Sequence, residues 1–190
     1  ATKLLNTLIA FDSFKEATEN AIKPDRMKDK YLVLRLIGFY LWRNKRLLSV
    51  KEKGLPLIEY RSDLEDFLGK TMMFLNDQAG STFCAQFPAL FDNTMKACRT
   101  ILGLGCFRLP KKGDGPRRPI SMALFETVSY LITELISLPQ EQHANLKIEF
   151  VKLLSDDDFI RSTTYIVDSN ISVNNRFGFV ETLIKEMRNA

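Results

Sequence analysis

The side chains that most often carry out catalysis are sparse in this chain of 190 residues. His143 is its only histidine, so a catalytic triad, a histidine-ligated metal or an H-E-x-x-H zinc site would lack residues that it needs. Asp156, Asp157 and Asp158 could coordinate a divalent cation. Consecutive carboxylates on a helix point in different directions, however, and the first turns of helices favour acidic residues. We therefore expect these aspartates to begin a helix, and we predict no catalytic residue, no metal site and no cofactor in this chain.

A pair of glycines near the middle of the chain is similar to the start of a dinucleotide-binding loop. In Gly103-Leu104-Gly105 the spacing of the first two glycines is right, but Arg108 stands where the third glycine should be. That loop also follows a strand, whereas the segment before Gly103 has helical periodicity. We interpret the two glycines as the end of a helix.

The densest cluster of charge lies in an irregular segment near residues 103–119, which we call the basic loop. Its cations are Arg108, Lys111, Lys112, Arg117 and Arg118. Gly113 and Gly115 give the backbone freedom, and Asp114 is the single opposing charge. Such a loop could hold a nucleic-acid phosphate backbone electrostatically. Charged loops are also commonly solvated connections, and the sequence leaves both interpretations open.

Helical periodicity recurs along the chain, and strand-like alternation is nearly absent. We expect helices over residues 2–21, 26–46, 62–75, 83–102, 120–138 and 141–154, a short one capped by Ser155, and a last one from Ser172. Ser62 and Glu65 have the spacing of a capping box, and Pro88 should delay or kink its helix. The predicted fold class is all-α: a single bundle of about seven or eight helices, forming one domain over residues 1–190.

The helix expected over residues 26–46 should lie in the centre of this bundle, because its middle is apolar on every side. Arg35 is the one charge in that apolar stretch, and a buried guanidinium without a counter-charge is very costly. We expect a carboxylate or several carbonyl groups from another helix to meet it. Arg26 and Asp29 stand three residues apart, the spacing of a structural ion pair on one helix face.

Composition places the chain among ordinary globular proteins, with 45% hydrophobic and 26% charged residues. A net charge of +4 permits a nucleic-acid partner without requiring one. The longest apolar run, Tyr31 to Trp42, contains Arg35 and is too short to span a bilayer, so no membrane is expected. Three cysteines without C-x-x-C spacing favour a reducing, cytoplasmic location. The chain starts at Ala1 inside a helical pattern, so we expect a domain fragment of a larger prokaryotic protein.

Several segments, in order along the chain, resemble one protein family. The residues Arg26-Met27-Lys28-Asp29-Lys30-Tyr31-Leu32-Val33-Leu34-Arg35-Leu36 are the most specific of them. In order, the others are Asp66-Phe67-Leu68, the stretch from Ile101 to Phe107, the stretch from Arg118 to Glu126, and Asn175-Arg176-Phe177. Together they resemble the N-terminal-domain family of GmrSD-type restriction endonucleases, which attack DNA with modified cytosines. Ser121 stands where that family has asparagine, and it keeps a side chain that can cap a helix.

The resemblance covers the helical part of that family and omits its catalytic part. Family members carry a ParB/sulfiredoxin-like subdomain with a D-G-Q-x-R signature, and no such run occurs here. The resemblance implies a non-catalytic portion of a nucleotide-dependent restriction factor for phage defence. Its partners would be the family's own N-terminal nuclease-like domain and, through the basic loop, DNA. The alternative is a purely structural or protein-docking module without nucleic-acid contact, and the sequence leaves the oligomeric state open.

Overall fold

The computed structural model describes residues 1–23, 25–111, 113 and 115–189, and the regular elements of the part that it describes are helices. Its α-helices are α1 (Thr2–Ala10), α2 (Asp12–Ala17), α3 (Lys28–Arg43), α4 (Leu64–Asn76), α5 (Ser81–Ala97), α6 (Met122–Glu134), α7 (His143–Leu153), α8 (Asp157–Thr164) and α9 (Asn170–Asn189). A π-helix, Cys98–Leu102, extends α5. The prediction of an all-α bundle is confirmed, with nine α-helices in the described residues instead of seven or eight.

The extra helix arises from a break at Phe11 inside the expected helix over residues 2–21. Phe11 has φ −59° and ψ 133°, an extended conformation that turns the chain between α1 and α2. The turn lets the rings of Phe11 and Phe14 both pack on Phe91 of α5, with centroids 6.4 and 6.0 Å away. Tertiary packing on α5 therefore overrides a helical periodicity that continues through the break.

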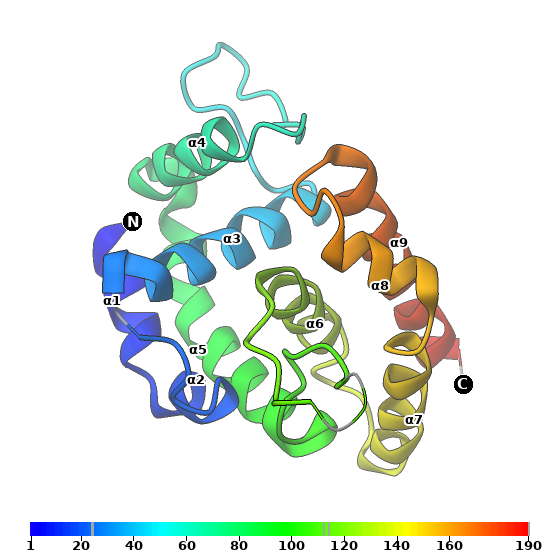
Figure 1. Cartoon of the computed structure of the whole chain (residues 1–190). Coiled ribbons are helices and arrows are strands. Elements are labelled where there is room, and N and C mark those ends of the chain that lie inside the picture. The colour runs from blue at the N-terminus through cyan, green and yellow to red at the C-terminus, as the bar shows by residue number, and fades with distance from the viewer. Residues whose placement is uncertain (24, 112, 114, 190) are drawn as a thin grey trace.

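Helix α3 lies in the middle of the bundle, as its apolar sequence predicts (Figure 1). It packs against α6, α1 and α4, and α6 in turn packs against α5 and α9. All residues of α6 from Ala123 to Thr133 are buried, so α6 is a second central helix. The core around these two helices is built mainly from phenylalanine and leucine side chains, which fits the fourteen phenylalanines of the composition.

Several helix ends lie one or two residues from their expected places. Asp63, and not Ser62, caps α4, where its Oδ1 accepts a hydrogen bond from the Asp66 amide at 2.9 Å. Asp156, and not Ser155, caps α8 through the Phe159 amide at 2.8 Å. Carboxylates and hydroxyls both accept from the free amides of a first turn, so the sequence does not distinguish neighbouring capping residues. The last helix begins at Asn170 and not at Ser172.

Helix α5 runs through Pro88 instead of beginning after it. Its end agrees with the prediction from the glycine pair, because Gly103 follows the π-helix with a positive φ of 89°. A positive φ is readily adopted by glycine and stops the helix there.

Candidate functional site

The basic loop is closed at its base by contacts between its two ends. Arg108 and Ile120 form an isolated antiparallel bridge, and the Ser121 amide donates to the Phe107 carbonyl at 2.9 Å. Ser121 then caps α6, its Oγ accepting from the Leu124 amide at 3.3 Å. The loop therefore connects the end of the α5 region to the start of α6 with a fixed base. Lys112 and Asp114 lie outside the described residues.

Glu19, just after α2, anchors two of the loop's arginines. Arg108 Nε donates to Glu19 Oε1 at 3.1 Å, and Arg117 Nη1 forms an ion pair with Glu19 Oε2. Arg108 Nη1 also donates to the Arg118 carbonyl at 2.5 Å, which joins the two sides of the loop. Burial raises the pKa of Glu19, but hydrogen bonds from the two guanidinium groups outweigh it and hold that pKa below its ordinary value.

Gly105 allows the Arg117 side chain to lie against the backbone at the start of the loop. Its φ is +81°, and a Cβ at this position would stand 2.9 Å from Arg117 Nη2. Glycine therefore serves both the backbone conformation and the close approach of the guanidinium. This glycine helps to shape the loop in addition to following the helix end.

The described cations of the basic loop consequently have different roles. The side chain of Arg108 is 12% exposed and held by Glu19. Lys111 is exposed, Arg117 keeps an exposed side chain while it contacts Glu19, and Arg118 is half-buried. Among the described cations, Lys111 and Arg117 are the ones best placed to meet a phosphate.

A cavity of about 480 Å³ joins the loop base to a second basic segment that the sequence analysis did not connect with it. Lys23 and Lys28 line this cavity together with Arg108, and the apolar residues that line it include Leu32 and Met122. Asp25 is the acidic side chain among its lining residues. We call the exposed cations around this cavity and on the loop the basic surface; its described members are Lys23, Lys28, Lys111 and Arg117.

The predicted ion pair between Arg26 and Asp29 involves a side chain outside the described residues, that of Arg26. Asp29 is buried at the first turn of α3, and its Oδ1 accepts a hydrogen bond from the Lys30 amide at 2.8 Å. The carboxylate thus complements the positive end of the α3 dipole.

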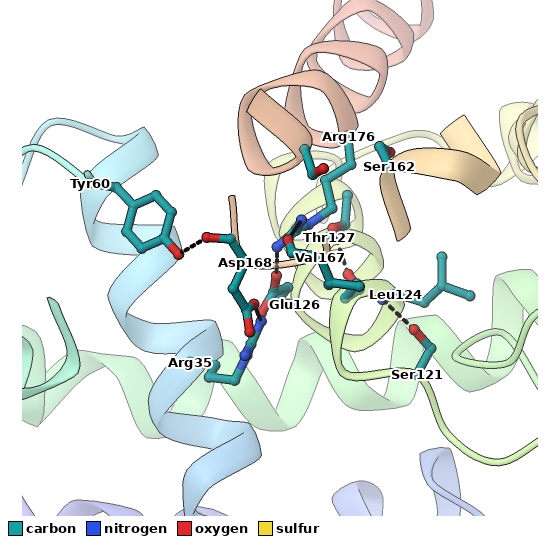
Figure 2. Close-up of polar contacts among 12 residues, drawn as sticks. Arg35, Tyr60, Ser121, Leu124, Glu126, Thr127, Ser162, Val167, Asp168 and Arg176 are labelled. Carbon is teal, nitrogen blue, oxygen red and sulfur yellow. Dashed lines mark hydrogen bonds and ion pairs between the residues drawn. The ribbon is translucent and has the colours of Figure 1, made fainter. Parts of the chain in front are cut away.

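Arg35 meets two carboxylates from distant parts of the chain (Figure 2). Its Nε donates to Glu126 Oε2 of α6 at 2.9 Å, and its Nη2 donates to Asp168 Oδ1, between α8 and α9, at 2.7 Å. Burial by itself lowers the pKa of Arg35. The negative charge of Glu126 and the hydrogen bonds to Asp168 and Glu126 have the opposite effect and outweigh it, so the pKa lies above its ordinary value. Arg35 therefore stays charged inside the bundle.

A second arginine completes this network from α9. Arg176 Nη2 forms an ion pair with Glu126 Oε1, and Arg176 Nη1 donates to the Val167 carbonyl at 2.6 Å. Tyr60 adds a hydrogen bond from its hydroxyl to the Asp168 carbonyl at 2.5 Å, and burial raises the pKa of Tyr60 to about 12. Glu126 and Arg176 are both fully inaccessible to solvent. The network, which we call the buried network, ties α3, α6 and α9 together, and its two inaccessible members cannot touch a substrate.

The other residues that could do chemistry occupy structural positions. His143 begins α7, and its Nε2 lies 3.1 Å from the Leu138 carbonyl. Asp157 and Asp158 occupy the first turn of α8, as predicted. Within the described ranges there is no group of three or more histidine, cysteine, aspartate or glutamate side chains that could hold a metal ion. Nor does any helix of those ranges combine the length and the apolar character that crossing a membrane requires.

Sequence analysis missed Glu19, Lys23, Lys28 and Glu126 as site or network residues. Glu126 carried a usable signal, because it is the one charge in the apolar stretch from Ile120 to Thr133, as Arg35 is in its own apolar stretch. Two such charges of opposite sign are natural partners. Glu19 carried none, since nothing in its neighbours connects it to a loop about ninety residues away. Lys23 and Lys28 became part of the basic surface only through tertiary contact.

No family model, no curated protein and no solved structure matches this chain. The resemblance to the GmrSD-type family therefore remains an expectation from the sequence motifs. Two of those motifs meet in the structure, because Lys28 of the first and Pro119 of the Arg118–Glu126 segment line the same cavity. Arg35 and Glu126, which belong to the same two motifs, form the ion pair at the centre of the buried network.

Proposed function

We propose that this chain is the helical, non-catalytic portion of a cytoplasmic, nucleotide-dependent DNA restriction protein of the GmrSD type. In this role it supports a separate nuclease-like domain and contacts DNA phosphates through the basic surface. The observation that carries the DNA contact is the convergence of two cationic segments, far apart in sequence, around one cavity. The family assignment itself is supported by the sequence motifs alone.

The cations of the basic surface and the cation at the base of the loop have different tasks. Exposed lysines and arginines gain from contact with phosphates because each contact releases condensed counterions from the nucleic acid. Lys23, Lys28 and Lys111 are exposed cations of this kind. Arg108 is largely buried and paired with Glu19, so its task is to fix the loop that presents Lys111 and Arg117. The proposed contacts are to phosphates, which carry no sequence information, so we expect binding with little sequence preference.

Salt-dependent binding of a short DNA duplex tests this proposal. Fluorescence anisotropy at two salt concentrations should give an affinity that falls steeply with salt, with a log–log slope of about −0.9 for each phosphate contact. Replacing Lys23, Lys28 and Lys111 by alanine should weaken binding and make the slope less steep by about two to three. A control variant, with Lys51, Lys53 and Lys185 replaced by alanine, removes the same charge from residues outside the basic surface and should keep the slope.

The outcomes of this titration separate two roles. An unchanged slope in the first variant would remove the basic surface from DNA contact. No binding even at low salt would assign any DNA recognition to the nuclease-like part and leave this chain as support. A docking module is the second candidate, and the observation that favours it is a group of exposed apolar side chains where α8 meets α9.

A further inference from the structure

Three large apolar side chains are exposed where α8 meets α9. Tyr165 is 61% exposed, Ile166 62% and Ile171 74%, the last being the highest value among the exposed large apolar side chains of the described chain. They surround a cavity of about 660 Å³ that Phe179 also lines. We call these four residues, with Asp158 and Arg161 beside them, the corner surface. Exposed apolar groups of this size gathered at one hollow typically mark an interaction site.

The corner surface is held rigidly in its exposed form. Ile166 has a φ of 41°, in the left-handed region that a β-branched residue rarely adopts. Its carbonyl accepts from the Ser169 amide at 2.9 Å, and the next two residues are fixed by the buried network through the Val167 carbonyl and the Asp168 carboxylate. Strain of this kind persists where the surrounding structure imposes it. The backbone of Ile166 is therefore fixed in a conformation that keeps its side chain exposed to solvent.

The charges of the corner surface are equal and opposite. Asp158 and Arg161 stand three residues apart on the exposed face of α8, and within the described part of the chain neither forms an ion pair or a side-chain hydrogen bond. The corner surface thus combines the acid Asp158, the base Arg161, the projecting side chain of Ile171 and the hollow beside Phe179. Such a surface is complementary to a second copy of itself. A two-fold axis places each such feature opposite its complement.

We propose that the corner surface binds a second copy of this chain across a two-fold axis. Ile171 of each copy occupies the hollow beside Phe179 of the other, and Arg161 of each copy faces Asp158 of the other. The neutral lining favours this occupant, because two chains that each carry a net charge of +4 associate best where neither presents excess charge. The segment that joins α8 to α9 lies apart from the chain leading into α6 (Figure 1), so we expect the dimer to leave the basic surface accessible.

Sedimentation equilibrium from about 1 to about 100 μM, the range of weak self-association, tests the assembly. The average mass should rise from one chain towards two across this range. Ile171→Glu places a carboxylate in the apolar contact and should raise the dissociation constant at least about ten-fold. Ile148→Glu is the matched control, since Ile148 is 55% exposed on α7 and lies outside the corner surface, and it should leave the dimer intact. Circular dichroism melting of each variant checks that the helices are retained.

Charge exchange tests the two-fold pairing itself. Asp158→Arg alone and Arg161→Asp alone each place like charges opposite one another, so each variant should be monomeric. An equal mixture of the two variants restores both pairs and should dimerise as the unaltered chain does. A monomer at every concentration for the unaltered chain, or a dimer that Ile171→Glu leaves intact, would overturn the proposal. Failure of the mixture to associate, with the unaltered chain dimeric, would overturn the two-fold pairing.

Discussion

The guanidinium of Arg35 donates to the carboxylate of Glu126 at 2.9 Å, between two helices that are both in the centre of the bundle. The other carboxylate oxygen of Glu126 forms an ion pair with Arg176, so one fully buried carboxylate pairs with two arginines from different helices. Asp168 balances the second positive charge. The packing of α3, α6 and α9 against one another should therefore depend strongly on Glu126.

Replacing Glu126 by glutamine should destabilise the protein by about 3–5 kcal/mol. The substitution keeps the shape of the side chain but leaves the buried Arg176 without its only carboxylate partner in the described chain. Urea unfolding, followed by circular dichroism, measures the change in the free energy of unfolding. A loss below about 1 kcal/mol would show that the buried network contributes little.

Glu181 provides the matched control. It pairs with Arg43, also between α3 and α9, but its side chain is 29% exposed and that of Arg43 is 17% exposed. Water screens this pair, so Glu181→Gln should cost only about 1 kcal/mol or less. Equal losses in the two variants would mean that burial does not distinguish the two pairs.

The base of the basic loop should open at acidic pH. Because the pKa of Glu19 is lowered in the folded state, its ion pairs stabilise the fold above the ordinary glutamate pKa of about 4.3, and the contribution is lost as the pH falls through the lowered value. The Ser121 amide closes the loop base by donating to the Phe107 carbonyl. Its protection from hydrogen exchange, measured relative to the intrinsic rate at each pH, should therefore fall in that acidic range.

Two variants of neighbouring glutamates check the assignment to Glu19. Glu19→Gln should give fast exchange at neutral pH and remove the acidic transition. Glu16 is exposed near the end of α2, the helix just before Glu19, and Glu16→Gln should leave the transition unchanged. A transition that persists in Glu19→Gln would assign it to another carboxylate.

The three cysteines should react with a thiol reagent at different rates in the folded protein. Burial raises the pKa of Cys106 to about 12 and that of Cys98 well above its ordinary value, whereas Cys84 is only partly buried and its pKa is raised less. The thiolate is the reactive form, so at pH 8 only Cys84 should be labelled at a measurable rate.

Labelling with Ellman's reagent, before and after denaturant, measures these rates. Cys84→Ser should abolish the reaction of the folded protein and leave two thiols that react after unfolding. Reaction of Cys98 in the folded protein would show that the π-helix after α5 opens locally.

The sequence predicts the helices well because their apolar periodicity reflects the core that they bury, and Gly103 marks the end of one of them correctly. It predicts that Arg35 needs a counter-charge, for the same reason of burial. Of the two partners, Glu126 could be inferred from its own place in an apolar stretch, whereas Asp168 lies 133 residues away between two helices, where no such signal marks it. The break at Phe11 and the anchoring of the loop by Glu19 are likewise products of tertiary packing, and local patterns in a single sequence carry no information about them.

The buried network also bears on the order in which the protein is made. Arg35 and Glu126 leave the ribosome long before Arg176, which lies 50 residues after Glu126. N-terminal segments emerge first, so the growing chain holds two helices with charged groups in their apolar faces until α9 arrives. We infer that the core closes only once α9 has been synthesised. A ribosome that stops before α9 would release a chain with exposed apolar helices, a natural target for chaperones and proteases.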